Sequence, residues 1–194
     1  MHATIFRTGL ATDESRAVNT IVLAFATDPV ARWIWPDPDR YFHVMPQFTR
    51  AFAGGAFVHH SALSSDDYTG VALWLPPGAH PDEEAVSKVV EESVSPAVRE
   101  DLYTLLEYMA ACHPQEPHWY LPMIGVDPAH QGRGHGAALL AHALEICDRQ
   151  HMPAYLESSN PRNISLYRRY GFEIIRAVGA GGSPPVVPMV RRAR

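Results

Sequence analysis

The sequence predicts an α/β protein built on a central mixed β-sheet of six to seven strands, with helices on both faces. Short apolar runs of strand length alternate with segments of helical periodicity. A glycine-rich loop joins one such run, 119–126, to a helix that is established by residue 137. A second apolar run, 154–158, follows that helix, and the right-handed crossover rule makes the two strands parallel neighbours in the sheet.

The first half of the chain is expected to supply one edge strand, a hairpin and several helices. Its elements are, in order, a strand over 4–8, helices over 15–28 and 37–53, hairpin strands over 56–61 and 69–75 around a turn at 64–67, and helices that begin near 82 and 95. Thr12 is placed to cap the first helix. Residues 30–36 are apolar and aromatic between two prolines, which suits either core packing or the wall of a small-ligand pocket.

After the run 154–158, the chain is expected to form a short helix and a closing antiparallel pair. The helix covers 161–170, and Gly171 suits the left-handed position that follows a helix end. The closing strands cover 172–177 and 186–191, joined by the Gly/Pro-rich loop 179–185. These two strands complete the mixed sheet.

Length and composition indicate a globular protein and exclude several functions. The 194 residues are expected to form one domain over 1–194, and 46% of them are hydrophobic. The net charge of −5 and the absence of a basic run before the last residues argue against nucleic-acid binding. Without a signal-peptide pattern or an apolar run of about 18 residues, we expect a cytoplasmic protein that does not bind membranes. The spacing of histidines and cysteines predicts no metal site.

The loop 131–136 is the strongest functional signal from the residues alone. It places three glycines within 132–136, directly before the helix. Glycine allows tight turns and close approach of another group to the backbone. The first turn of a helix has unpaired N–H groups at the positive end of the helix dipole. The combination predicts an anion site suited to phosphate, although a tight turn without a ligand is the simpler alternative.

Two motifs at this spacing resemble a known family. Residues 131–136 fit the pattern Q/R-x-x-G-x-G/A after a strand that ends Ile-Gly-Val, and 160–172 fit Asn-x-x-x-x-x-Leu-Tyr-x-x-x-Gly-Phe. Together they resemble the GNAT superfamily of acyl-CoA-dependent N-acyltransferases. The stretch 116–173 is most similar to puromycin N-acetyltransferases and their actinobacterial relatives. The resemblance implies a GNAT fold, with the sheet splayed at a cofactor cleft, and a possible role in antibiotic resistance.

The resemblance also implies a role for each matched position. The stretch 116–173 would be the acyl-CoA-binding core, and 1–115 would form mainly the acceptor side and scaffold. Acetyl-CoA would be the co-substrate, with no metal. Its pyrophosphate would lie on the glycine loop, and its pantetheine arm would add to the splayed edge of the strand 119–126. The implied cofactor-binding residues are Ile124, Gly125, Val126, Gln131, Gly132, Arg133, Gly134, Gly136, Ala137, Asn160 and Asn163.

Tyr167 matches the general acid of the family. Amine attack on a thioester expels a thiolate whose pKa is about 8.5, and a phenol of pKa near 10 can donate to it as charge develops. A simpler interpretation makes Tyr167 a core residue with its hydroxyl at the surface. For Arg133 the simpler alternative is a side chain that faces solvent, and for Asn163 it is a residue that only starts a helix.

The general base and the acceptor residues are less determined. Glu157 follows the second central strand and is the preferred base, directly or through water. His118 and Tyr120 on the first strand, and Asp28, His59 and His60 on the acceptor side, are alternatives, while an amine that is already deprotonated needs no base. We expect Asp28, Trp33 and Tyr120 to contact the acceptor.

The predicted function is transfer of an acetyl group from acetyl-CoA to a primary amine of a small molecule, by a monomer or homodimer. One alternative is a non-catalytic acyl-CoA-binding regulatory module. Another is an NAD(P)-binding oxidoreductase, because Gly132, Gly134 and Ala137 satisfy G-x-G-x-x-A. Five residues, 127–131, separate that loop from its strand, whereas a dinucleotide-binding loop leaves its strand almost directly.

Overall fold

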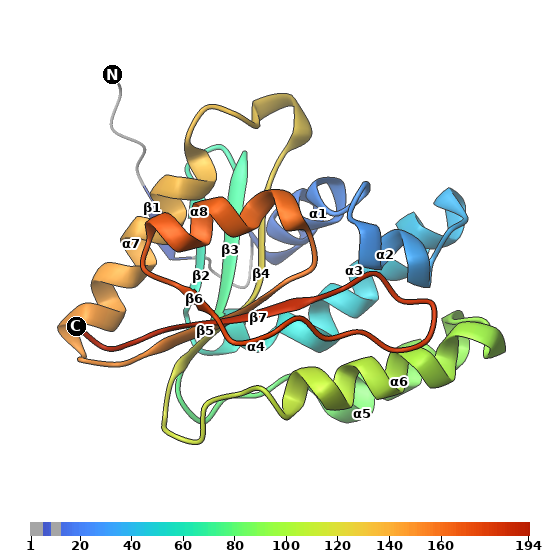
Figure 1. The fold of residues 1–194 in the computed structure, drawn as a ribbon. Helices are drawn as coiled ribbons and strands as arrows, with labels where there is room; N and C mark the ends of the chain where they lie inside the picture. The colour runs from blue at the N-terminus through green and yellow to red at the C-terminus, as the bar shows by residue number, and fades with distance from the viewer. Residues whose placement is uncertain (1–5, 9–12) are drawn as a thin grey trace.

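The computed structural model describes residues 6–8 and 13–194, with side chains from residue 13 onward, as a single sheet with helices on both faces (Figure 1). The strands are β1 Phe6–Thr8, β2 Ala62–Ser65, β3 Gly70–Leu75, β4 Trp119–Val126, β5 Ala154–Ser158, β6 Glu173–Ile174 and β7 Val187–Arg191. The α-helices are α1 Glu14–Ala24, α2 Pro29–Ile34, α3 Pro38–Ala53, α4 Gly55–Val58, α5 Glu83–Ser93, α6 Pro96–Ala110, α7 His135–Arg149 and α8 Ile164–Arg169. Two 3₁₀ turns are η2 Pro128–His130 and η3 Pro161–Asn163.

The sheet has seven strands in the order β1-β2-β3-β4-β5-β7-β6. All neighbours are antiparallel except β4 and β5, which are parallel and are connected through α7. A parallel pair needs such a crossover, because a tight turn can join only antiparallel strands. The prediction of a mixed sheet of six to seven strands with helices on both faces is confirmed.

The parallel pair separates along its length. β4 and β5 are in register only from Trp119 to Leu121, opposite Ala154 to Leu156. On the other side of β4, Leu73 pairs with Met123 but Leu75 pairs with Tyr120, so β4 has one residue more than β3 over this stretch. This bulge contains Pro122, which has no N–H for a ladder and is tolerated at such irregularities. Beyond the bulge, β4 diverges from β5 and leaves a gap between them.

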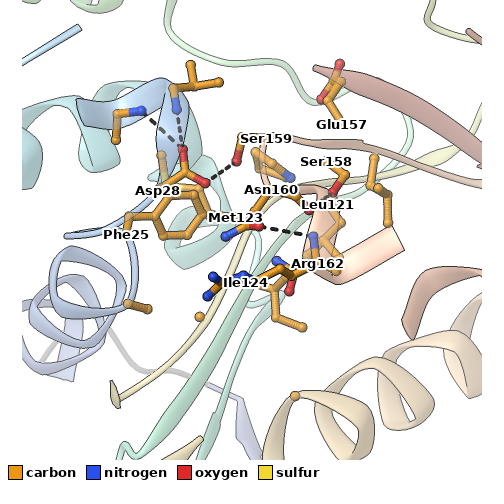
Figure 2. A pocket seen from close by; sticks show the side chains of 18 of the residues that line it. Phe25, Asp28, Leu121, Met123, Ile124, Glu157, Ser158, Ser159, Asn160 and Arg162 are labelled. Atoms are coloured by element: carbon orange, nitrogen blue, oxygen red, sulfur yellow. Dashed lines mark hydrogen bonds between the residues drawn. The ribbon is translucent and has the colours of Figure 1, made fainter. Parts of the chain in front are cut away.

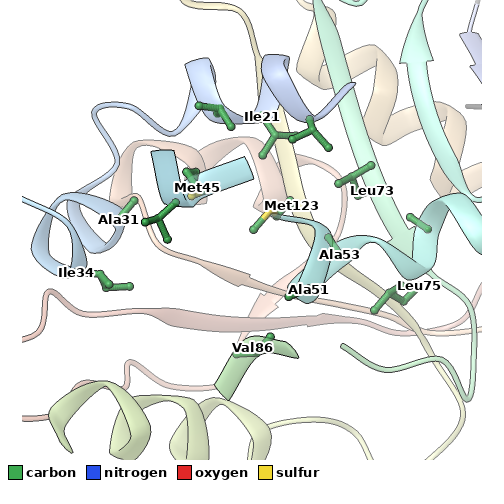
Figure 3. Packing of buried hydrophobic residues seen from close by; sticks show 14 of the residues in the cluster. Ile21, Ala31, Ile34, Met45, Ala51, Ala53, Leu73, Leu75, Val86 and Met123 are labelled. Carbon is green, nitrogen blue, oxygen red and sulfur yellow. The ribbon is translucent and has the colours of Figure 1, made fainter. Parts of the chain in front are cut away.

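Two apolar cores fill the two faces of the sheet. Alternate strand residues divide between them: Leu73 and Met123 belong to the core under α1, α2, α3, α5 and α6, whereas Ala72 and Leu121 belong to the core under α7 and α8. Figure 3 shows side chains of the first core, where Ile21 and Met45 from two helices converge on the sheet. Successive side chains of a strand point to opposite faces of the sheet, so each strand contributes residues to both cores.

The first helix is shorter than expected, and a further helix follows it. The helix predicted over 15–28 ends at Ala24, and Pro29–Ile34 forms a separate helix, α2, for which the sequence predicted no secondary structure. Asp28 begins α2, since its carboxylate accepts hydrogen bonds from the first-turn N–H groups and Pro29 occupies the position where a missing donor costs nothing. The proposed cap Thr12 lies outside the described residues.

The predicted hairpin is displaced along the chain. Residues 55–58 form the helix α4 instead of a strand, and the strand β2 occupies 62–65. The turn lies at 66–69 because Asp67 organises it, accepting hydrogen bonds from Ser65 Oγ at 2.8 Å and from Thr69 N at 3.1 Å. The prediction of a strand over 56–61 with a turn at 64–67 is therefore wrong.

The last strands are confirmed with one difference. β7 agrees with the predicted 186–191, whereas β6 covers only Glu173–Ile174 of the expected 172–177. A single isolated bridge, Val178 to Val186, continues the pairing. Among the described residues, no helix is both long enough and apolar enough to span a membrane.

Close packing of α1 against β4 depends on Gly125. A Cβ atom at this position would lie 2.6 Å from Ala24 Cβ and 3.3 Å from Ile21 Cδ1. We expect Gly125→Ala to lower the free energy of unfolding by about 1–3 kcal/mol, measured by urea denaturation, because α1 has to move. Gly136→Ala is the control: its Cβ would meet only Val126 Cγ2, at an ordinary 3.6 Å. Equal stabilities for the two variants would contradict this view of the α1–β4 contact.

Candidate functional site

The gap between β4 and β5 opens into a cavity of about 650 Å³. Its walls come from both halves of the chain: the segment between α1 and α2, parts of α3 and α6, the far end of β4, the glycine loop, the end of β5, and α8. Figure 2 shows Asp28, Glu157 and Asn160 among the residues that line it. A volume of this size accommodates part of a cofactor together with a small second ligand.

The glycine loop forms one end of the cavity. Gly132 and Gly134 have φ of +75° and +88°, in the left-handed region that favours glycine, and a Cβ on either would meet no atom within 4 Å. Gly134 precedes α7, and no side chain caps this helix start. The space in front of the first turn is therefore open, and an anion can use its N–H groups.

The edge of β4 that faces the gap has backbone groups that pair with neither neighbouring strand. Asp127 N donates to Thr69 O at 2.8 Å, which points the backbone groups of Asp127 toward β3. Because these directions alternate along an antiparallel strand, the groups of Ile124 and Val126 point the other way, into the gap. Val126 O accepts a hydrogen bond from Gln131 Nε2 at 3.1 Å, which ties the glycine loop to this edge.

Tyr167 approaches the cavity from α8. Its side chain is 5% exposed, and it is one of the lining residues. Burial raises the pKa of the Tyr167 phenol, and the nearby Asp28 carboxylate acts in the same direction. The hydroxyl therefore keeps its proton at physiological pH and is available as a donor.

Asp28 is a buried carboxylate on the opposite wall. Its Oδ1 accepts from Val30 N at 3.0 Å and Ala31 N at 3.1 Å, and its Oδ2 accepts from Ser159 Oγ at 2.6 Å (Figure 2). Burial raises the pKa of Asp28, although these three hydrogen bonds oppose the shift. The Ser159 contact joins the α1–α2 segment to the residues after β5, across the cavity mouth.

Glu157 lies on β5, beyond the point where that strand separates from β4. Its side chain is only 4% exposed, and His113 Nε2 lies 3.2 Å from Oε1. The two atoms are at ion-pair distance without an aligned hydrogen bond, and Oε1 has no other hydrogen-bond partner among the described residues. Burial raises the pKa of Tyr120 well above its usual range, and the adjacent Glu157 carboxylate contributes.

Apolar and aromatic side chains make up the part of the cavity farthest from the glycine loop. Trp35 and Phe48 meet edge to face at 5.3 Å between ring centroids, and Phe48 stacks on Phe52 at 5.3 Å. Leu105 and Met109 of α6 complete this wall. Trp35 donates to Ser93 Oγ at 3.0 Å, so its one polar atom is already satisfied.

Most of the predicted site residues line the cavity. They are Asp28, Ile124, Gly125, Val126, Gln131, Gly132, Gly134, Gly136, Ala137, Glu157, Asn160, Asn163 and Tyr167. The lining does not include Trp33, Arg133 or Tyr120. Trp35 lines the cavity in place of Trp33, because the α2 helix turns these two neighbours in different directions. Tyr120 is buried behind the wall, where its ring packs against His113 and Phe52.

Several residues of the site were not predicted. Ser159 holds Asp28, and His113 contacts Glu157, yet neither belongs to a motif. Phe48 and Phe52 lie in the helix predicted over 37–53, and their spacing of four residues was the available signal that they share one face.

The geometry defines a ligand cleft between splayed parallel strands with an anion-binding loop at one end. Comparison with known proteins identifies the class: residues 23–172 match the family model described as the acetyltransferase (GNAT) family. The protein therefore belongs to the GNAT family of acetyltransferases.

Individual relatives agree with this assignment. An uncharacterized N-acetyltransferase of Schizosaccharomyces pombe is 27% identical over 176 residues, covering 84% of this chain and 71% of the relative. A Corynebacterium glutamicum structure described as histone acetyltransferase HPA2 and related acetyltransferase has a TM-score of 0.70 at 24% identity, covering 99% and 97% of the two chains. Arylalkylamine N-acetyltransferase 2 from Aedes aegypti has a TM-score of 0.68 at 14% identity and full coverage of both chains. These two structures are evidence for the shared fold alone.

The raised pKa of Asp28 predicts a pH-dependent stability. A carboxyl with a higher pKa in the folded state contributes stability that is present below about pH 4 and is lost as pH rises through the folded pKa. We expect Asp28→Asn to destabilise the protein less at pH 8 than at pH 5 in urea unfolding, because the stability contributed by the protonated Asp28 is lost as pH rises. Ser159→Ala removes a hydrogen-bond donor to the ionised Asp28 carboxylate. The free energy of unfolding of this variant should therefore fall more steeply with rising pH than that of the unmodified protein. A pH-independent effect of Asp28→Asn would contradict the assignment.

Proposed function

We propose that this protein transfers an acetyl group from acetyl-CoA to a primary amine of a small molecule, by direct attack in a ternary complex. The observation that carries the proposal is that one cavity joins an uncapped helix start, the open edge of β4, and the side chains of Tyr167 and Glu157. In this proposal, residues 116–173 bind the acyl-CoA, and residues 1–115 mainly form the acceptor side of the cleft and the scaffold.

The proposed cofactor position follows from the polar groups at each end of the cleft. The pyrophosphate lies on the N–H groups of the loop from Gly132 to Ala137, where positive-φ glycines leave room for close approach. The pantetheine arm adds to β4 as an extra strand, using the backbone groups of Ile124 and Val126. Gln131, Arg133, Asn160 and Asn163 surround the cofactor, and no metal takes part.

The proposed chemistry assigns one role to each titratable group. The amine nitrogen attacks the thioester carbon, and a backbone N–H of β4 holds the oxygen as it becomes negative. The C–S bond then breaks, Tyr167 donates its proton to the departing thiolate, and the phenolate regains a proton as the product nitrogen loses its own. Asp28 lies where it can attract the incoming ammonium group, and Glu157 receives the proton that this group loses before the attack.

The acceptor is proposed to be an amine with an apolar body. The wall formed by Trp35, Phe48, Phe52, Leu105 and Met109 carries no charge of its own. A charged group that contacted only this wall would be buried unpaired, which favours an amine with an apolar body over one with a second charge. The Aedes aegypti relative is named for arylalkylamines, but here the acceptor class is inferred from the lining itself.

Acetyl-CoA binding and Tyr167→Phe test the proposal together. We expect acetyl-CoA to raise the melting temperature, whereas NAD and NADP do not. Tyr167→Phe should keep this shift but lower kcat by about 100-fold or more, because the buried phenol is the proton donor to the thiolate. Acetyl transfer is followed as free thiol released from acetyl-CoA.

The matched control is Tyr170→Phe, which removes a hydroxyl outside the cavity lining and should leave both measurements unchanged. Acetyl-CoA binding without turnover on any amine would favour the regulatory module, and a shift with NAD or NADP alone would favour the oxidoreductase. Puromycin belongs in the amine panel because the sequence resembles puromycin N-acetyltransferases, and its acetylation would indicate a resistance role.

A matched pair of amines tests the acceptor class. Hexylamine and 1,6-diaminohexane have the same chain length and differ in one terminal charge. We expect kcat/KM to be at least about tenfold higher for hexylamine, because the far wall offers no partner to a second ammonium group. A preference for the diamine would overturn the apolar acceptor and leave the acetyl transfer itself unaffected.

A further inference from the structure

A line of three side chains leads from the cavity to the protein surface. It begins at Glu157, whose Oε1 is 3.2 Å from His113 Nε2. His113 Nδ1 in turn lies 3.2 Å from His118 Nε2, and His118 Nδ1 lies 2.8 Å from the carbonyl oxygen of Glu116. Exposure increases along this line, from 4% for the Glu157 side chain to 27% for His113, and Glu116 is exposed.

The last contact determines where the protons lie on both rings. A carbonyl oxygen can only accept, so His118 Nδ1 carries a proton and donates it to Glu116 O. Burial lowers the pKa of His118, which keeps this ring neutral and leaves a lone pair on its Nε2. His113 Nδ1 must then donate to that lone pair, so a neutral His113 presents its own lone pair to Glu157.

At the inner end, two acceptors therefore face each other. With a carboxylate at Glu157 and a neutral ring at His113, neither Oε1 nor Nε2 carries a proton, and the two atoms lie 3.2 Å apart. One added proton would bridge the two atoms. The arrangement provides a place for a proton that arrives on Glu157 from the cavity side.

Aromatic rings hold His113 in this position. The centroid of its ring lies 4.2 Å from that of Tyr155 on β5 and 4.7 Å from that of Tyr120 on β4. The Tyr155 hydroxyl donates to Met109 O at 3.3 Å, which ties β5 to the end of α6. The titratable or charged groups around Glu157 and the two histidines are His80, Cys112, Glu116, Tyr120, Tyr155 and Arg176.

We propose that Glu157, His113 and His118 form a proton exit path, through which the proton removed from the amine leaves the buried site in each turnover. The amine proton passes to Glu157, and the resulting O–H gives it to His113 Nε2. The imidazolium so formed loses a proton to bulk water, directly or through His118, which restores the carboxylate and the neutral rings. His113 acts through Glu157 and positions it. A buried base without such a path could lose its proton only when a water molecule entered the site.

This role rests on the proposed acetyl transfer, but the proton positions can be tested without any substrate. Long-range ¹⁵N NMR of the histidine rings at pH 8, assigned with His113→Gln and His118→Gln, should show both rings in the Nδ1–H form. An Nε2–H form at either ring would overturn the path, whether or not the protein acetylates amines.

The kinetic test uses acetyl-CoA and hexylamine. His113→Ala should lower kcat by roughly tenfold or more while leaving the thermal shift with acetyl-CoA unchanged, and free imidazole should restore much of the loss. His43→Ala, which removes an exposed histidine on α3, is the control and should neither lose activity nor respond to imidazole. Unchanged turnover in His113→Ala, or a loss that imidazole does not restore, would overturn the relay while the acetyl transfer stands. Absence of turnover in the unmodified protein would instead count against the proposed function, and the NMR result would then decide the relay.

Discussion

The structure depends on the limited pairing of β4 with β5. A strand inside a sheet normally uses the backbone groups of both its edges, yet β4 does so on the β5 side only from Trp119 to Leu121. The bulge that contains Pro122 bends β4 away while its pairing with β3 continues. Groups that would otherwise bond to β5 are thus left facing a cavity, next to the open start of α7. The proposed binding of an extended ligand with a phosphate end depends on this one irregularity.

Packing around the gap keeps it from closing. Gly125 lets α1 approach β4 closely on one face, and α7 and α8 cover the other face through a separate core. The Asp28–Ser159 hydrogen bond connects the segment between α1 and α2 to the residues that follow β5. Both carboxylates of the cavity are buried, but their surroundings differ: Asp28 is fully hydrogen-bonded as a helix cap, whereas Glu157 faces a histidine with which it shares no aligned hydrogen bond. This difference leaves Glu157 Oε1, and neither oxygen of Asp28, without a hydrogen-bond partner, as the proposed proton acceptor requires.

The fold was predictable wherever local pattern and tertiary packing agree. The run 119–126, the glycine loop and the helix α7 were found because apolar periodicity and glycine spacing are local signals. The hairpin was misplaced because residues 56–61 have strand-like composition, while the turn is set by hydrogen bonds of Asp67 that composition does not reveal. The helix α2 was missed for a related reason, since its six residues are too few to show a helical period and its start depends on the Asp28 cap.

The sequence by itself determined the class of protein, because the motifs at 131–136 and 160–172 encode backbone geometry at the cofactor end within short stretches. It also marked Tyr167 and Glu157 as candidates, from their places within the second motif and at the end of a strand. Only the tertiary structure decided which residues form the acceptor wall, that Trp35 rather than Trp33 lines it, and that His113 meets Glu157. The physical reason is that these contacts join α2, α3, α6 and β5, which are distant in the chain, and no local spacing records how helices pack across a sheet.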